Sequence, residues 1–72
     1  MGINRQMQGD SFLNYYISCN RFTVWVQCVR GKSGNIAIVD CAPIVSKFRG
    51  QYLSNLIKWA KSFGGFKIEE LL

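Results

Sequence analysis

The sequence predicts a small α+β fold in which one helix packs on a face of an antiparallel sheet of three or four strands. Three observations support this fold class: apolar residues alternate over 21–30, a glycine-containing turn follows, and an amphipathic segment ends at two glycines. The chain has 72 residues, a length typical of one domain. We expect a single domain over 1–72 in the order ββ(β)αβ. Residues 1–10 have no periodic pattern and are expected to be a flexible start.

The sheet is expected to begin with a short strand at 12–17, where the run FLNYYI is rich in aromatic residues. The clearest strand is RFTVWVQCVR, because apolar residues at its even positions alternate with Arg21, Thr23, Trp25 and Gln27 at its odd positions.

A hairpin is expected over 21–41, because a glycine turn at 31–35 joins the clearest strand to the β-branched run NIAIVDCA. Pro43 then stops the second strand and suits the first turn of a helix.

The helical segment is expected to have two parts. Projection of residues 44–63 at 100° per residue gives a broad apolar side and a lysine side. Gly50 interrupts this pattern, and an interior glycine costs about 1 kcal/mol, so we expect a break near Arg49 and Gly50 and a main helix over 51–63. Two glycines then favour a helix end, and the tail FKIEELL favours a last short strand.

The composition favours association with a partner. Nine Lys and Arg residues against four Asp and Glu give a formal charge of +5, which attracts polyanions such as nucleic acid or an acidic protein surface. Hydrophobic residues form 49% of the chain and aromatic residues 14%, more than a small monomer readily buries. We therefore expect a homo-oligomer or a protein that docks on something larger, and the alternative is a compact monomer with an unusually aromatic core.

Six residues are candidates for binding. Arg21, Trp25 and Gln27 would lie on one side of the clearest strand, where a cation beside an aromatic ring suits base stacking. The competing interpretation places Trp25 under the helix. Lys47, Arg49 and Lys58 could contact phosphates, although a charged helix face is commonly only solvated.

Catalysis has few candidate groups. The chain has no histidine, and its three cysteines lack the spacing of a zinc site or a redox pair. Asp40 could orient a Cys41 thiolate whose pKa Lys47 or Arg49 lowers, but Asp40 could equally accept backbone N–H bonds while Cys41 packs inward. The sequence therefore predicts no enzyme, no metal and no cofactor.

The compartment is expected to be the cytoplasm, without membrane association. The N-terminal segment is too polar for a signal peptide, and no apolar stretch approaches the roughly 20 residues that cross a bilayer.

An ordered pattern covers residues 22–70: FTVWVQ, a glycine turn, IVDCAPIVSKFRGQ, LSNLIKWAKSFGG and FKIEEL. It resembles a group of very short uncharacterised proteins of bacteriophages and other mobile elements, identified by the "APIV-x-KF-x-GQ" junction. The resemblance implies a viral or mobile-element setting, in the host cytoplasm if viral. No binding or catalytic residue carries over from that group to this chain. Tyr52 departs from the proline that this pattern has at the helix start.

Two functions follow as hypotheses. The leading one is a small non-enzymatic binding protein that engages an anionic partner, either nucleic acid, a nucleotide or a host protein, through a basic and aromatic surface. The alternative is a structural or assembly protein that forms a homo-oligomer through its aromatic surface and has no ligand.

Overall fold

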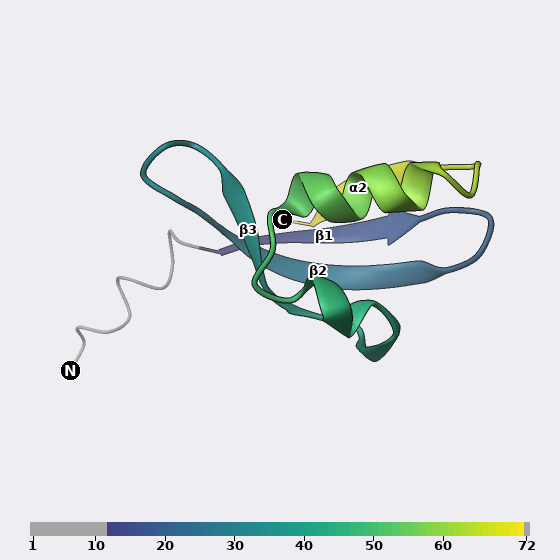
Figure 1. The fold of residues 1–72 in the computed structure, drawn as a ribbon, viewed down its shortest axis with the longest axis horizontal. Helices are drawn as coiled ribbons and strands as arrows, with labels where there is room; N and C mark the ends of the chain where they lie inside the picture. The colour runs from purple at the N-terminus through teal and green to yellow at the C-terminus, as the bar shows by residue number, and fades with distance from the viewer. Residues whose placement is uncertain (1–11, 72) are drawn as a thin grey trace.

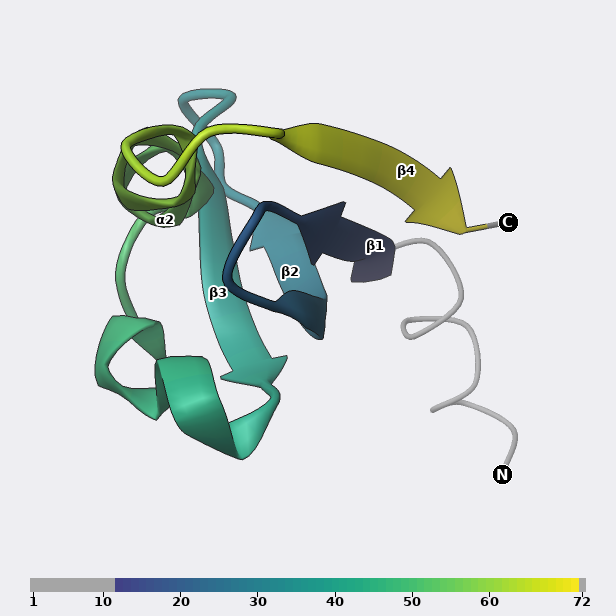
Figure 2. The same cartoon turned by 90° about the vertical axis from the view of Figure 1, so that its right-hand side faces the viewer.

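A computed structural model describes residues 12–71 and confirms the α+β class, with a four-stranded antiparallel sheet and the helical segments on one of its faces (Figure 1). The expected flexible start at 1–10 lies outside the described residues. The elements are β1 (Phe12–Ser18), β2 (Thr23–Arg30), β3 (Ile36–Cys41), the 3-10 segment η1 (Pro43–Phe48), α2 (Leu53–Lys61) and β4 (Lys67–Leu71). The strand order is β3-β2-β1-β4, so the two central strands are β2 and β1, and β4 is the outermost strand on the side away from β3 (Figure 2).

The alternation in β2 decides which face of the sheet is covered. Val24, Val26 and Cys28 are buried in the core, so the intervening Trp25 points to the face away from the helical segments. The interpretation that Trp25 lies under the helix is therefore wrong. The strand begins at Thr23 rather than at 21, and Arg21 lies before it.

An irregularity in the β2–β3 pairing keeps β3 apolar toward the core. Ile38 and Cys41 are both buried although they are three residues apart, a spacing that would put them on opposite faces of a regular strand. The pairing register shifts between Gln27 and Cys28, which oppose Asp40 and Ile38, so one extra residue of β3 is accommodated there.

The junction after β3 turns back on the sheet at Gly50, whose φ of 87° confirms the break predicted there. The Gly50 N–H donates to the Ile38 carbonyl at 2.7 Å, and the Ile38 N–H donates to the Gln51 carbonyl at 2.8 Å. These bonds occupy the outer edge of β3, so the junction closes this side of the sheet.

The main helix is shorter than predicted, beginning at Leu53 rather than at 51 and ending at Lys61 rather than at 63. Its start is delayed because Tyr52 keeps an extended backbone and forms a bridge with Ala37. Leu53, Leu56 and Ala60 are its buried residues, the i, i+3, i+7 spacing of one helix face. In residues 12–71, no helix has the length and apolar content needed to span a bilayer.

The turn between α2 and β4 contacts the β1–β2 turn through Asn20. The Asn20 N–H donates to the Gly64 carbonyl at 2.8 Å, and its side-chain amide donates to the Phe63 carbonyl at 3.1 Å. Gly65 has a φ of 71°, and a Cβ atom on it would overlap the Asn20 amide. The helix end and the start of β4 are thus fixed against the opposite turn.

Gly65→Ala is expected to lower the free energy of unfolding more than Gly50→Ala. Both substitutions put a Cβ on a positive-φ backbone, at about 1–2 kcal/mol. Only the first also displaces Asn20 from its hydrogen bond, at about 1 kcal/mol more, because a Cβ on Gly50 would meet open space. Urea denaturation followed by circular dichroism measures both losses, and equal losses would contradict the described turn contact.

Candidate functional site

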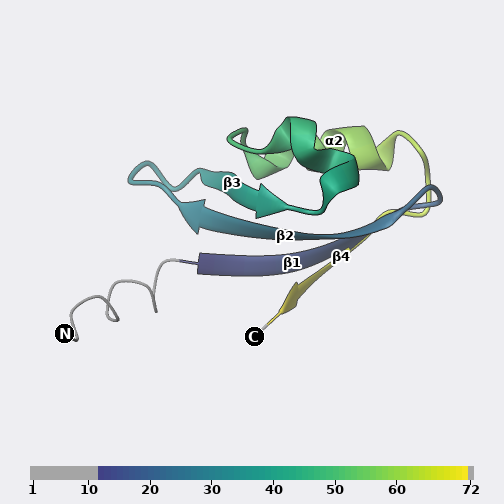
Figure 3. The same cartoon turned by 90° about the horizontal axis from the view of Figure 1, so that it is seen from below.

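The six candidate binding residues divide between two sides of the molecule. α2 and η1 form one layer on the sheet, and the other sheet face has no helical cover among the described residues (Figure 3). Trp25 and Gln27 lie on the uncovered face, whereas Arg21, Lys47 and Lys58 belong to the helical side. Arg49 is exposed at the edge next to β3. The structure therefore does not gather all six on one surface.

The open sheet face, the side away from α2 and η1, carries aromatic rings and few charges. Tyr16 of β1 lies directly opposite Trp25 of β2, and Asn14 lies opposite Gln27. Phe12, Tyr16 and Trp25 are each between 42% and 46% exposed. The β1–β4 register puts Glu69 beside Tyr16 and Lys67 beside Ser18, so the charges that β4 adds cancel.

A second aromatic group lies on the helical side, and sequence reasoning missed it. This aromatic cluster consists of Phe22, Phe48, Trp59 and Phe63. The Trp59 ring stacks on Phe22 at 5.4 Å between centroids and meets Phe63 edge to face at 5.0 Å. Trp59 and Phe63 are four residues apart, which is the signal that could have predicted their contact.

Two of the candidate cations lie over this aromatic cluster. The Lys47 ammonium is 4.5 Å from the centroid of Trp59, and the Arg21 guanidinium carbon is 5.4 Å from that of Phe63. Lys61 lies similarly over Phe66, at 5.3 Å. We call four cations around α2 the basic helix surface: Arg21, Lys47, Lys58 and Lys61.

The acidic groups of the described residues lie on β3 and β4, outside the basic helix surface, although Glu70 lies opposite Tyr15 on the helical side of the sheet. Asp40 pairs with Arg49 at 3.2 Å, and because both side chains are more than half exposed this ion pair contributes little stability. Glu69 and Glu70 are both on β4. Among residues 12–71, no cation of the basic helix surface forms an ion pair, so no described carboxylate compensates its positive charge by direct contact.

Asp40 and Cys41 both make structural contacts where β3 ends. The Asp40 carboxylate accepts the Cys41 N–H at 2.9 Å, and the Cys41 thiol packs inward, 3.5 Å from the Val45 carbonyl. Burial raises the pKa of Cys41, and the nearby Arg49 only partly opposes this effect. The thiol is therefore not activated as a nucleophile.

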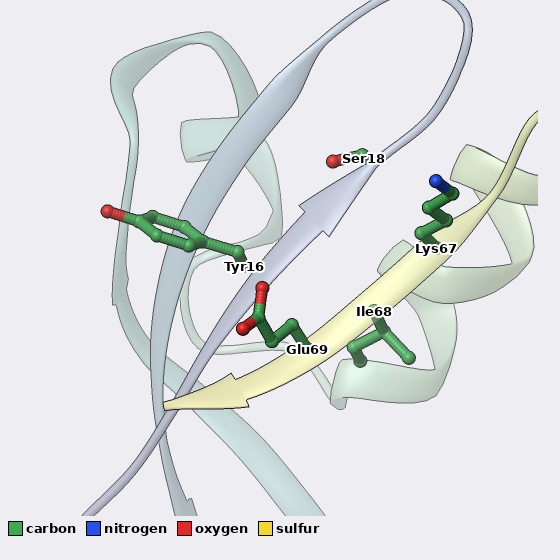
Figure 4. Close-up of a pocket in the computed structure, with 5 residues that line it drawn as sticks. All are labelled: Tyr16, Ser18, Lys67, Ile68 and Glu69. Carbon is green, nitrogen blue, oxygen red and sulfur yellow. The ribbon is translucent and has the colours of Figure 1, made fainter. Parts of the chain in front are cut away.

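A shallow hollow of about 310 Å³ lies between β1 and β4 (Figure 4). Tyr16, Ser18, Lys67, Ile68 and Glu69 line it. Another, of about 250 Å³, lies beside the start of α2 and is lined by residues of the β2–β3 turn together with Tyr52 and Ile57. Neither is lined by a residue of the basic helix surface.

No family model, curated protein or solved structure matches this chain. The resemblance to short phage and mobile-element proteins therefore stays a prediction. Within residues 12–71, no three His, Cys, Asp or Glu side chains are grouped closely enough to hold a metal ion.

The stability of the fold is expected to fall between pH 9 and pH 11. Burial, together with the nearby Cys41, raises the pKa of Cys28 from 9.0 to about 11. The folded chain thus keeps this thiol protonated where the unfolded chain releases its proton. This stability is fully present below pH 9 and is lost as the pH rises through 11.

Urea midpoints measured across this range test the expectation, with Cys28→Val as the matched variant. Between pH 9 and pH 11, the free energy of unfolding of the variant should fall less than that of the parent. Burial also raises the pKa of Tyr15, so part of the pH dependence should remain. Identical pH profiles for the two proteins would contradict the buried thiol.

Proposed function

We propose that this chain is a small non-enzymatic binding protein that engages a polyanion through the basic helix surface, with a nucleic-acid strand as the favoured class. The observation that carries the proposal is the separation of charge. Four cations surround α2 without an ion pair among the described residues, while the described acids lie on β3 and β4. An uncompensated cationic surface attracts phosphates and releases counterions when it binds them.

An extended polyanion fits this surface better than a free nucleotide. Nucleotide sites are concave and enclose most of the ligand. The two hollows described above are lined by other residues, and the basic helix surface follows the exposed side of a helix. Contact with a strand would therefore be made to phosphates along the chain.

Base stacking has weaker support than phosphate contact. Stacking platforms place exposed rings next to a positively charged groove. Here the exposed rings of Tyr16 and Trp25 lie on the face whose β4 charges cancel, whereas Trp59 and Phe63 already have cations over them. We therefore expect binding with little dependence on base sequence.

Assembly through the open sheet face is the second candidate, and one observation favours it. Tyr16 and Trp25 lie opposite each other and are nearly half exposed, as is Phe12 beyond the Asn14–Gln27 pair on the same face, and exposed aromatic groups of this kind often mark interaction sites. Aromatic residues are also enriched in protein interfaces. Assembly of this type would persist at high salt, unlike contact with phosphates.

Titration with a fluorescent single-stranded oligonucleotide at several salt concentrations tests the leading proposal. Three or four phosphate contacts predict a slope of log K against log salt of about −2 to −3 for a single strand. Lys47→Gln and Lys58→Gln should each make that slope shallower by about 0.7.

Lys32→Gln is the matched control, because Lys32 lies in the β2–β3 turn outside the basic helix surface, and this variant should keep the parent slope. An oligonucleotide that fails to bind at low salt would overturn the proposal. The proposal would also be overturned if Lys32→Gln changed the slope of log K against log salt as much as Lys47→Gln.

A further inference from the structure

The two edges of the sheet differ in how their backbone groups are satisfied. The edge of β3 is occupied by residues 50–52, as described above. β4 pairs with β1 on one side only, and among residues 12–71 no backbone hydrogen bond reaches its outer side. An unpaired edge strand is a template for another strand.

The core also ends abruptly at this edge. Ile17 of β1 is fully buried, whereas Ile68, its direct partner on β4, is 40% exposed on the same side of the sheet. Lys67 and Glu69 extend to the opposite side of β4 from Ile68, toward the open sheet face (Figure 4). The edge therefore combines free backbone groups, an exposed apolar side chain and one charge of each sign.

We propose that β4 pairs antiparallel with β4 of a second copy of this chain, so that two four-stranded sheets join into one sheet of eight strands. A two-fold axis that relates adjacent antiparallel strands runs perpendicular to the sheet and passes between one residue and its own copy. The choice of register is therefore limited to the five residues of β4.

The two-fold axis can thus be centred on any of these five residues, and the charge pattern favours one of them. A centre at Lys67, Glu69 or Glu70 places like charges directly opposite each other, which destabilises an antiparallel pair. A centre at Leu71 leaves most of the strand unpaired. A centre at Ile68 opposes the two isoleucines on the helical side and sets Lys67 against Glu69 of the partner subunit, twice, on the open sheet face.

Charges on edge strands commonly prevent association. In β4 they do not, because the order Lys67, Ile68, Glu69 is complementary to itself under this two-fold axis. The same register opposes Phe66 to Glu70 of the partner subunit, which brings that carboxylate toward Lys61 over the Phe66 ring. The second copy thus supplies charges opposite to those this edge presents.

Light scattering coupled to size-exclusion chromatography, over a wide range of protein concentration, is the first test. The mass should rise from that of one 8.2 kDa chain to that of two. Lys67→Glu and Glu69→Lys alone should each raise the dimer dissociation constant by about tenfold, because both ion pairs become repulsions.

Charge exchange then tests the register itself. The double variant, Lys67→Glu with Glu69→Lys, should restore the dimer, and an equal mixture of the two single variants should form a mixed dimer. Lys58→Glu carries the same charge change on α2 and should leave the mass unchanged. Circular dichroism establishes that each variant remains folded.

Several outcomes would overturn the proposal. A chain that stays monomeric while the β4 amides that point away from β1 are protected from hydrogen exchange would mean that another segment occupies the edge. A dimer that survives both single variants but is lost in Trp25→Gln would place the interface on the open sheet face. Oligonucleotide binding by the basic helix surface is measured separately, so either proposal can fail without the other.

Discussion

One constraint governs the molecule: four strands share one layer of helical cover, so only one face of the sheet can be buried. The register of β2 decides which face, because Val24, Val26 and Cys28 point under α2 and η1. Trp25 must then point outward, where Tyr16 lies opposite it. The cations on α2, on η1 and in the β1–β2 turn lie on the helical side of the sheet. The basic helix surface and the exposed aromatic rings of the open sheet face are therefore separated by the thickness of the sheet.

The elements with strong local signals could be predicted from the sequence. The period-two pattern around Trp25, the helical periodicity after Gly50 and the two glycines after α2 each encode their own backbone conformation. The face that the helix covers stayed open between two interpretations, because Trp25 adds a large apolar ring to the otherwise polar side of β2. The shifted β2–β3 register and the pairing of Asp40 with Arg49 depend on contacts between elements. The place of Arg21 also depends on contacts between elements. The sequence pattern put it on the strand face, whereas in the structure it precedes the strand and its guanidinium lies over Phe63.

The proposed interactions use different parts of this architecture and are compatible. A two-fold axis at Ile68 runs through the sheet edge and leaves Lys47 and Lys58 free. It places two basic helix surfaces on the same side of a continuous sheet, which would double the cations facing an extended polyanion. Two open sheet faces would also adjoin on the opposite side. Association at the sheet edge would thereby give the dimer a larger continuous surface than one chain of 72 residues has.

The most direct test of the central claim uses the two tryptophans, because one lies on each side of the sheet. Trp25→Phe and Trp59→Phe each leave a single fluorophore, and both proteins can be titrated with the same unlabelled oligonucleotide at low salt. The account predicts that emission from Trp59, which lies under the Lys47 ammonium, changes on binding, whereas emission from Trp25 stays constant. A change in Trp25 with a silent Trp59 would contradict the separation of functions and would assign the anionic partner to the open sheet face.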